Sequence, residues 1–223
     1  VTTLPSIIDI DTGFGEAMNC TRTVQELVEL GLSGCHLEDQ ENPKRCGHLD
    51  GKAIVSREQM IKKIKAASGG KNLDPNFLII ARTDSRATEG LDKAIDRAKA
   101  YVDAGAEMIF PEALQDEGEF EKVRKAIQVP LLCNMTEFGK SNLLSSKQLQ
   151  NLGYNLVIYP VTSLRLAMKA VEQGFIHIRD EGSQEKILDR MQHRKDLYDL
   201  VRYEDYNKFD QNIFNFKIPE EEK

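Results

Sequence analysis

The sequence contains no apolar run near the roughly 20 residues that an α-helix needs to cross a bilayer. Its four cysteines, Cys20, Cys35, Cys46 and Cys133, include no C-x-x-C pair, so their spacing indicates neither a zinc knot nor a disulfide framework. A basic excess is also missing: the formal net charge is -6, which argues against nucleic acid as the main partner. These absences predict a globular protein of a reducing compartment, the cytoplasm or, in a eukaryote, the mitochondrial matrix, with neither nucleic acid nor a membrane among its partners.

Short apolar runs alternate six times with amphipathic segments. The runs are typical of strands buried on both faces, and they cover residues 6–11, 34–39, 77–84, 108–113, 130–136 and 156–162. Helices are expected near residues 19–30, 56–67, 89–105, 117–127, 145–152 and 163–173. This alternation predicts parallel strands joined by crossover helices, either in an open doubly wound sheet or in a closed barrel.

Polar residues end every predicted strand, and this favours the barrel. A doubly wound sheet builds its site at one switch point, whereas a (β/α)8 TIM barrel gathers groups from all its strand ends at one rim. We therefore predict a single α/β barrel domain over residues 1–223, with 1–180 forming barrel units three to eight and 181–223 forming C-terminal helices and a tail. Because the chain opens inside a strand and without an initiator Met, the first two βα units are expected to be absent from this sequence.

Asp9 and Asp11 are the clearest candidate metal ligands. Residues i and i+2 of a strand project from the same face, so the two carboxylates converge on one point. A few carboxylates, with the other positions left to water and substrate, suit Mg2+ or Mn2+ better than zinc. Glu38, at the end of the next strand, can join through a bridging water. A strand end that begins a turn would also explain the pair alone, but the polar ends of the other strands favour the metal site.

A polar loop with the sequence NPKRCGHLDGK, residues 42–52, contains Cys46 between Lys44, Arg45 and His48. Its Gly, Pro and Asn content disfavours helix or strand. Nearby positive charge favours the thiolate and makes the thiol proton transferable. The loop is therefore predicted to do chemistry and to close over a substrate, and the alternative is a solvated surface loop with an incidental cysteine.

Six motifs carry a family resemblance: DIDTGFG, HLEDQ, KRCGH, ARTDS, FPEA and NMTEFG, in this order. They resemble the isocitrate lyase and phosphoenolpyruvate mutase superfamily over essentially the whole chain. The KRCGH loop is similar to that of the lyase branch. Isocitrate lyases have a long insertion and a serine- and proline-rich segment where this chain has NMTEFG, so the short form favours the 2-methylisocitrate lyases.

The resemblance implies a Mg2+-dependent cleavage, with Mn2+ as an alternative ion, of the tricarboxylate 2-methylisocitrate to pyruvate and succinate in the methylcitrate cycle of propionate catabolism. Asp9, Asp11 and Glu38 would hold the metal. Cys46 would be the acid that protonates the succinate aci-carboxylate, with Lys44 and His48 tuning it. The implied substrate contacts are Cys46, Gly47, Arg82, Glu112, Asn134, Met135, Thr136, Arg165 and Arg194.

The resemblance also implies homotetramers, as dimers of dimers that exchange C-terminal helices. The aromatic tail YEDYNKFDQNIFNF independently predicts a surface that needs burial. Arg194 is expected on the apolar stripe of one C-terminal helix with Ile187, Met191, Tyr198 and Val201, where it needs a ligand or a structural salt bridge. His36, Cys20, Cys35 and Cys133 are expected to be satisfied core residues, and Asp84 is a candidate for orienting its neighbours.

Other functions stay open at this point. Isocitrate or a dimethylmalate are alternative substrates of the same lyase chemistry. A phosphonate mutase or an oxaloacetate decarboxylase-like enzyme is a further alternative, which the cysteine loop disfavours. A barrel that has lost activity and serves in assembly is the third.

Overall fold

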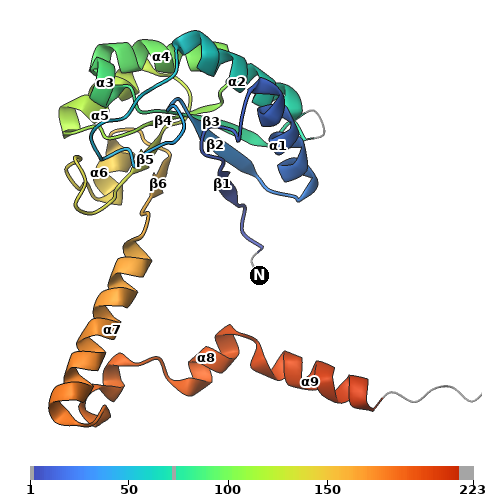
Figure 1. Cartoon of the computed structure of the whole chain (residues 1–223), viewed down its shortest axis with the longest axis vertical. Coiled ribbons are helices and arrows are strands. Elements are labelled where there is room, and N and C mark those ends of the chain that lie inside the picture. The colour runs from blue at the N-terminus through green and yellow to red at the C-terminus, as the bar shows by residue number, and fades with distance from the viewer. Residues whose placement is uncertain (1–2, 72–73, 216–223) are drawn as a thin grey trace, which may run out of the picture. The chain divides into compact units, whose positions relative to one another are not determined.

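A computed structural model of the chain describes residues 3–71 and 74–215 (Figure 1). The chain divides into two compact units, Val1–Thr162 and Ser163–Lys223, which are taken in turn. No helix within the described residues is both long and apolar enough to pass through a membrane. The prediction that residues 1–223 form a single domain stays a prediction.

The first unit alternates strands and helices, as the sequence predicts. Its strands are β1 (Ile7–Asp9), β2 (Gly34–Glu38), β3 (Leu78–Thr83), β4 (Met108–Pro111), β5 (Leu132–Asn134) and β6 (Leu156–Ile158). Its helices are α1 (Ala17–Glu29), α2 (Arg57–Gly70), the short α3 (Arg86–Glu89), α4 (Leu91–Asp103), α5 (Glu117–Ala126) and α6 (Ser146–Asn151). All six predicted strands are present, although each is shorter than its apolar run.

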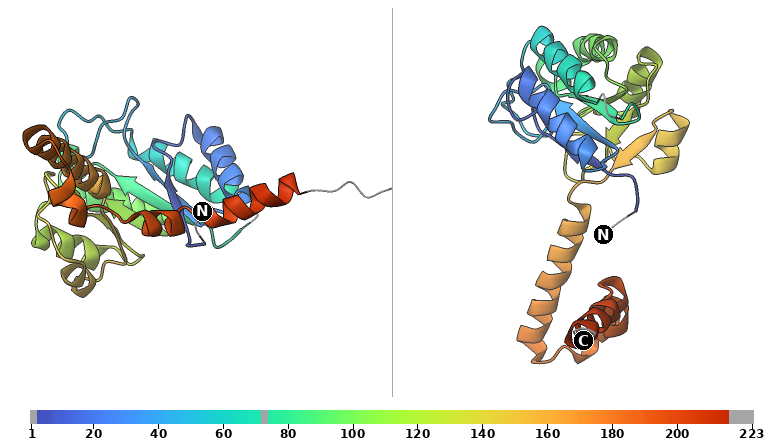
Figure 2. Two further views of the ribbon diagram at one scale, coloured as in Figure 1. Left: turned by 90° about the horizontal axis from the view of Figure 1, so that it is seen from below. Right: turned by 90° about the vertical axis from the view of Figure 1, so that its right-hand side faces the viewer.

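The strands lie parallel and in sequence order. β1 to β4 form one sheet, and β5 pairs with β6. A parallel bridge between Ile109 and Leu131 joins β4 to the start of β5, with a hydrogen bond from the Ile109 N–H to the Pro130 carbonyl (3.1 Å). An order without reversal has no switch point, and right-handed crossovers then put every helix on the same face. Figures 1 and 2 show the helices covering one face of the curved strands.

Each helix buries one stripe against that face. In α1 the buried residues Cys20, Val24 and Leu27 recur at helical spacing, and in α2 Met60 and Ile64 do the same. Ser56 and Ser145 precede α2 and α6 as their N-cap residues and form capping boxes with glutamines three residues later. Cys35 and Cys133 are also fully buried, so these cysteines and Cys20 are core residues, as expected.

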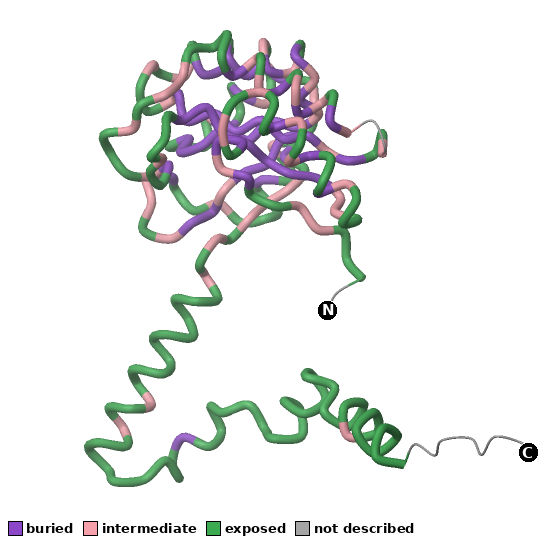
Figure 3. The backbone as a smooth tube through the Cα atoms, turned by 45° about the vertical axis from the view of Figure 1, so that its right-hand side comes forward, coloured by how far each residue is buried: buried purple, intermediate pink, exposed green. Residues whose placement is uncertain are grey.

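Two apolar clusters lie on opposite sides of the sheet. The larger one fills the space between strands and helices, and it includes Leu37, Ile79 and Ile109. The smaller one contains the alternate residues of the same strands, among them Ile80 and Phe110. A sheet with apolar side chains on both faces is characteristic of a barrel wall, in which the concave face also packs side chains. Figure 3 shows the buried backbone gathered in the strands of this unit.

The two edge strands differ from the prediction of strands buried on both faces. β2, β3 and β4 are buried almost throughout, whereas β1 ends in exposed residues and β6 is only half-buried along its length. Ile8, for example, is 39% exposed. The reason is that β1 and β6 each have a partner strand on one side only.

The second unit exposes nearly all of its side chains. It is built from α7 (Thr162–Glu181), a 3-10 helix η1 (Glu185–Arg190), α8 (Arg194–Leu200) and α9 (Tyr203–Phe214). Of its described residues only Ile187 is buried, while Phe175 is 69% and Phe209 65% exposed. An apolar hollow of about 350 Å3 lies between α7 and η1, lined by residues such as Val171 and Met191.

This unit corrects the predicted C-terminal helix. The apolar residues at 187, 191, 198 and 201 do not lie on one helix, because η1 ends at Arg190 and α8 begins only at Arg194. His193 caps α8 by accepting the Lys195 N–H at its Nδ1 atom (3.2 Å). Arg194 is therefore the first residue of a short helix and is exposed in this chain, rather than lying on a buried stripe.

Candidate active site

The polar side chains at the strand ends continue the alternation of the concave apolar cluster. Ile7, Ile80 and Leu132 belong to that cluster, and the residues two positions later in the same strands are Asp9, Arg82 and Asn134, with His36 and Glu38 on the same face of β2. Asp11, Glu112 and Thr136 come just after the strand ends, and Asp11 lies in a turn with a φ of 51° rather than in the strand with Asp9, contrary to the prediction. The site is thus the carboxyl-end rim of the concave face, where parallel barrels do their chemistry.

Three carboxylates surround one cation at this rim. The Lys44 Nζ atom lies 2.5 Å from Asp11 Oδ1, 3.6 Å from Glu38 Oε2 and 3.7 Å from Asp9 Oδ2. Burial opposes the charged ammonium, yet the contact with Asp11 and the charges of Glu38 and Asp9 raise the pKa of Lys44. The predicted metal ligands are therefore brought together, with the side chain of Lys44 between them.

Glu38 is the most constrained member of this cluster. It is 1% exposed, and neither of its carboxylate oxygens accepts a hydrogen bond, although Arg82 Nε lies 3.2 Å from Oε2. Burial raises the pKa of Glu38 to about 7, an effect that the nearby Arg82 reduces. Arg82 and Lys44 therefore compensate part of its charge, but a buried carboxylate that accepts no hydrogen bond still costs free energy unless a ligand uses it.

The cluster fits a hard divalent cation by its donors. Its oxygens come from three carboxylates, which are the ligands that Mg2+ prefers in proteins. As they are arranged here, no three or more His, Cys, Asp or Glu side chains among the described residues form a group that could hold a metal ion. In the present arrangement the ammonium of Lys44 supplies the positive charge, so Lys44 must move for the carboxylates to close on an ion.

His36 belongs to this site, contrary to the prediction of a satisfied core histidine. Its side chain faces the concave side, packs edge-on against Phe110 (centroids 5.6 Å apart) and places Nδ1 3.6 Å from Asp9 Oδ1. Nδ1 is buried without a hydrogen-bond partner. Burial lowers the pKa of His36, so the ring is neutral near pH 7.

Arg82 is fixed in the middle of the rim. Its guanidinium donates to Asp84 from Nε (2.9 Å) and from an Nη atom (3.2 Å), and it lies 5.1 Å from the centre of the Phe110 ring. Burial alone would lower the pKa of Arg82, but Glu112 and Asp84 raise it. Asp84 therefore orients Arg82, as the sequence suggested.

Glu112 receives contacts from two elements. Asn134 donates to its Oε1 (3.2 Å), and His48 Nε2 lies 3.0 Å from the same oxygen. Burial would raise the pKa of Glu112, yet the contacts with His48, Arg82 and Asn134 lower it, so Glu112 is a carboxylate. The Asn134 Oδ1 atom is buried without a partner and is open to a donor from a ligand.

His48 has a defined tautomer. Its Nδ1 accepts the Lys140 backbone N–H (2.9 Å), so in the neutral ring the proton is on Nε2, next to Glu112. A Cβ added to Gly139 would lie 2.5 Å from Nδ1, so this ring packs directly against the 139–140 backbone. The predicted catalytic His48 is thus placed to hold Glu112 and to join the cysteine loop to residues 139–140.

The cysteine loop lies over Arg82 and Glu112. Gly47 is buried, and an added Cβ would lie 2.2 Å from Glu112 Cγ and 2.7 Å from an Arg82 Nη atom. Only a glycine allows this approach, and the substrate contact implied at Gly47 stays a prediction. Cys46, next to it, is exposed and is not in a disulfide.

The remaining predicted substrate contacts are Met135, Thr136, Arg165 and Arg194. Met135 is a member of the core cluster between strands and helices, so its side chain points away from the concave face. Thr136 is buried at the rim. Arg165 and Arg194 belong to the second unit, and their roles stay predictions.

Two buried polar residues were missed by the sequence reasoning. Lys52 Nζ lies 3.4 Å from Asp84 and also donates to the Gly47 carbonyl, with its side chain only 1% exposed. Gln40 is 1% exposed and bonds to the backbone of Arg45. Gln40 lies two residues before the cysteine loop and Lys52 is its last residue, so their place in the sequence was the only available signal, and it does not reveal their contacts.

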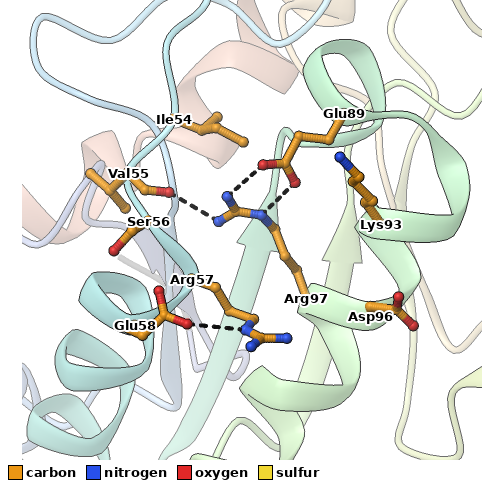
Figure 4. A pocket seen from close by; sticks show the side chains of 9 residues that line it. All are labelled: Ile54, Val55, Ser56, Arg57, Glu58, Glu89, Lys93, Asp96 and Arg97. Carbon is orange, nitrogen blue, oxygen red and sulfur yellow. Dashed lines mark hydrogen bonds and ion pairs between the residues drawn. The ribbon is translucent and has the colours of Figure 1, made fainter.

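A separate hollow of about 540 Å3 lies on the helical side, between the start of α2 and α4 (Figure 4). Arg97 donates to both oxygens of Glu89 and to the Val55 carbonyl there. The other charged lining residues, Arg57, Glu58, Lys93 and Asp96, balance in sign. Arg57 pairs with Glu58 there (3.4 Å) as Arg97 does with Glu89, whereas the rim has buried polar atoms without hydrogen bonds and is therefore the candidate site.

Comparison with known proteins agrees with this placement. The family model for phosphoenolpyruvate phosphomutase matches residues 1–179. The chain is 59% identical to the probable 2-methylisocitrate lyase 1 of Corynebacterium glutamicum, over 97% of this chain and 71% of that protein. It is 52% identical to the 2-methylisocitrate lyase of Halalkalibacterium halodurans, over 95% of this chain and 70% of that protein.

Solved structures show the same architecture. Oxaloacetate acetylhydrolase in complex with 3,3-difluorooxalacetate superposes with a TM-score of 0.86 and 31% identity, covering 96% of this chain and 72% of that one. The 2,3-dimethylmalate lyase superposes with a TM-score of 0.85 and is 29% identical, over 96% of this chain and 73% of that one. Phosphonopyruvate hydrolase in complex with oxalate and Mg2+ superposes with a TM-score of 0.79 and is 29% identical, over 93% of this chain and 72% of that one.

A parallel α/β fold whose charged groups converge at the carboxyl ends of the strands defines this chain as an enzyme of the TIM-barrel-like class. Within that class the chain belongs to the phosphoenolpyruvate phosphomutase family, in the isocitrate lyase and phosphoenolpyruvate mutase superfamily. The family resemblance predicted from the six motifs is therefore confirmed.

Proposed function

We propose that this chain is a Mg2+-dependent lyase that cleaves 2-methylisocitrate to pyruvate and succinate in propionate catabolism. The observation that carries the proposal is a set of buried polar atoms without partners on the concave face, namely His36 Nδ1, both carboxylate oxygens of Glu38 and Asn134 Oδ1. They lie under a loop that bears an exposed thiol. Relatives at 52–59% identity are named 2-methylisocitrate lyases, whereas the superposed hydrolases and the dimethylmalate lyase reach only 29–31%.

The metal belongs at Asp9, Asp11 and Glu38. The convergence of these three carboxylates on the ammonium of Lys44 supports the assignment. When bound, Mg2+ supplies positive charge for the hydroxy-acid oxygens of the substrate. Lys44 leaves the cluster and then contributes its charge to the anionic substrate.

Arg82, Asn134 and Gly47 bind and orient the substrate. The fixed guanidinium of Arg82 is suited to a carboxylate, because two of its N–H groups can donate in parallel. The buried Gly47 backbone faces the same spot, and Asn134 Oδ1 is open to a donor. Glu112, held as a carboxylate by His48, keeps Arg82 and Asn134 in place.

Cys46 delivers the proton. Loss of the substrate hydroxyl proton to a base lets the carbon–carbon bond break, which forms the carbonyl of pyruvate and leaves the electron pair on the succinate part as an aci-carboxylate. The Cys46 thiol protonates the carbon and becomes a thiolate, which then regains a proton.

The full fold and assembly are part of the same proposal. β1 to β6 form six of the eight strands of a closed barrel, and the exposed edges of β1 and β6 support this. The exposed apolar residues of the second unit support a homotetramer that exchanges C-terminal helices between subunits. Light scattering should then give a mass about four times the 25.2 kDa of the chain; a monomeric mass would contradict the exchange.

A product assay tests the activity. The intact protein, with all eight strands of the proposed barrel, is supplied with 2-methylisocitrate or with isocitrate, each with and without Mg2+, and pyruvate and glyoxylate are measured. We expect equal amounts of pyruvate and succinate from 2-methylisocitrate, only with the metal. Faster glyoxylate release from isocitrate would point to isocitrate lyase activity, and no release from either would favour the assembly role.

A further inference from the structure

The cysteine loop is closed at its base by backbone pairing. Glu41 N–H donates to the Ala53 carbonyl (2.9 Å) and Val55 N–H to the Asp39 carbonyl (2.9 Å), so the two ends of the loop run antiparallel. Gln40 is bridged to Ile54 in the same ladder. Residues 42–52 therefore form a loop whose two ends lie side by side. Cys46 lies in the middle of this loop, so the pairing at the ends cannot by itself orient it.

Gln40 reaches from this base into the loop. Its Oε1 accepts the Arg45 N–H (2.9 Å), and its Nε2 donates to the Arg45 carbonyl (2.8 Å). One amide side chain thus pairs with both backbone groups of the residue that precedes Cys46. Because Gln40 is 1% exposed, its side chain is held by packing and cannot follow a moving loop.

The consequence for Cys46 follows from peptide planarity. The Arg45 carbonyl and the Cys46 N–H belong to one rigid plane, so Gln40 fixes that plane. The next plane is fixed because the Cys46 carbonyl accepts the Leu49 N–H (2.9 Å), and the one after it because the Gly47 carbonyl accepts from Lys52. The backbone of Cys46 is therefore fixed on both sides, although its side chain is exposed.

We propose that Gln40 is a positioning residue for the acid Cys46, which it aims by holding the peptide plane between Arg45 and Cys46. This inference rests on the proposed function for the role of the thiol. Among the described residues, the Gln40 side chain hydrogen-bonds to the backbone of Arg45 and not to the three carboxylates or Arg82, so its role concerns where the proton is delivered and not how the substrate is held. Misplacing a reacting group by about 1 Å costs on the order of 100-fold in rate.

The positioning role of Gln40 can be separated from a purely structural role with two variants. Arg45 is exposed, so water can satisfy its N–H and carbonyl when Gln40 is replaced, and Met in its place buries no polar group. Q40M should therefore keep the fold with a small change in melting temperature. A suitable control is Y154F, which removes a buried hydrogen bond from Tyr154 to the Phe120 carbonyl (3.1 Å) far from the loop.

The experiment compares the full chain, Q40M and Y154F with 2-methylisocitrate and Mg2+. For Q40M we expect kcat to fall about 10- to 100-fold with KM within about twofold, and the amide of Arg45 to exchange hydrogen at least about tenfold faster. Y154F should lower the melting temperature but leave kcat and that amide unchanged. A Q40M variant with the wild-type kcat, or with the wild-type exchange at Arg45, would overturn the proposal.

Q40E gives a second test that keeps the side-chain volume. Its carboxylate can accept the Arg45 N–H but repels the Arg45 carbonyl, whereas the protonated acid can donate as the amide does. The ratio of its kcat to that of wild type should therefore rise as the pH falls, and a ratio independent of pH would contradict the role of the Nε2 donor. Hydrogen exchange needs no turnover, so if the wild-type chain releases no pyruvate the proposed function fails while the clamp at Arg45 is still tested.

Discussion

Two adjacent carboxylates, Glu38 and Asp39, have opposite surroundings. Glu38 points to the concave face and accepts no hydrogen bond, although it is buried. Asp39, the next residue, points toward the helices and accepts from Thr83 Oγ1 (2.7 Å), Tyr101 OH (2.8 Å) and the Asp84 N–H (2.9 Å). The same chemical group is thus saturated by the protein on one side of the sheet and left for a ligand on the other.

This difference separates a structural function, on the helical side of the sheet, from a ligand-binding function on the concave side. The Asp39 side is a framework, in which Arg97 donates to Tyr101 (3.1 Å) and to Glu89 at the outer hollow. The concave side, at Glu38, instead contains buried polar atoms without hydrogen bonds, which lowers the stability of the fold. We therefore expect substitutions on the concave side to affect chemistry more than folding, and those on the helical side to do the reverse.

The largest effect is expected at the concave side, for Cys46→Ser. A hydroxyl is a far weaker acid than a thiol, so turnover should fall by roughly 1,000-fold, while the exposed position leaves stability nearly unchanged. Pyruvate release and a urea unfolding curve measure the two effects. Turnover like that of wild type would remove Cys46 from the role of acid.

Asp39→Asn should do the opposite. Loss of the charge that accepts from Thr83, Tyr101 and Asp84 leaves buried donors poorly paired, and the free energy of unfolding should fall by about 3 kcal/mol. Mg2+ affinity of the folded fraction should stay as in wild type. Urea unfolding checks the first point, and an unchanged midpoint would show that the two sides do not differ as described.

Glu38→Gln removes charge from the other member of the pair. Burial raises the pKa of Glu38 to about 7, so its charged form is disfavoured in the folded chain and a neutral amide should keep or slightly raise stability. Mg2+ affinity should fall about 10- to 100-fold, measured as the metal concentration for half-maximal turnover. A destabilisation as large as that of Asp39→Asn would contradict the division.

The smallest effect is expected at the outer end of the framework, for Glu89→Gln. The hydrogen bond from Arg97 lowers the pKa of Glu89, so its contribution is fully present above the ordinary value of 4.5 and is lost as the pH falls through the lowered pKa. The variant should be less stable by about 0.5 kcal/mol at neutral pH, and the difference should vanish in acid. Thermal unfolding at several pH values would show whether the gap persists, contrary to this linkage.

The sequence predicted the alternation of strands and helices well, because buried strands and amphipathic helices differ in the period of their apolar residues. The same period-2 argument would have put His36 beside Glu38 on the concave face, so that residue was within reach of the sequence. The end of one helix and the start of another before Arg194 could not be predicted from the sequence. The apolar spacing continues across this break, and only the cap at His193 reveals a new helix.

The contacts of the cysteine loop could not be predicted from the sequence. Lys44 among the three carboxylates, Lys52 at Gly47, and the 139–140 backbone at His48 join segments whose proximity depends on the fold and not on any local pattern. Residue types identified which groups can do chemistry, but only the structure shows which of them touch.

Binding of Mn2+ to the free protein tests the central claim most directly, because it needs no substrate. Electron paramagnetic resonance of the free ion can be followed as Mn2+ is added to wild type, to Asp11→Asn and to Asp50→Asn, which removes an exposed carboxylate from the same loop. We expect one ion per chain, bound at least about tenfold more weakly by Asp11→Asn and equally well by Asp50→Asn. Equal binding by all three proteins would contradict a metal site at the carboxylates of Asp9, Asp11 and Glu38.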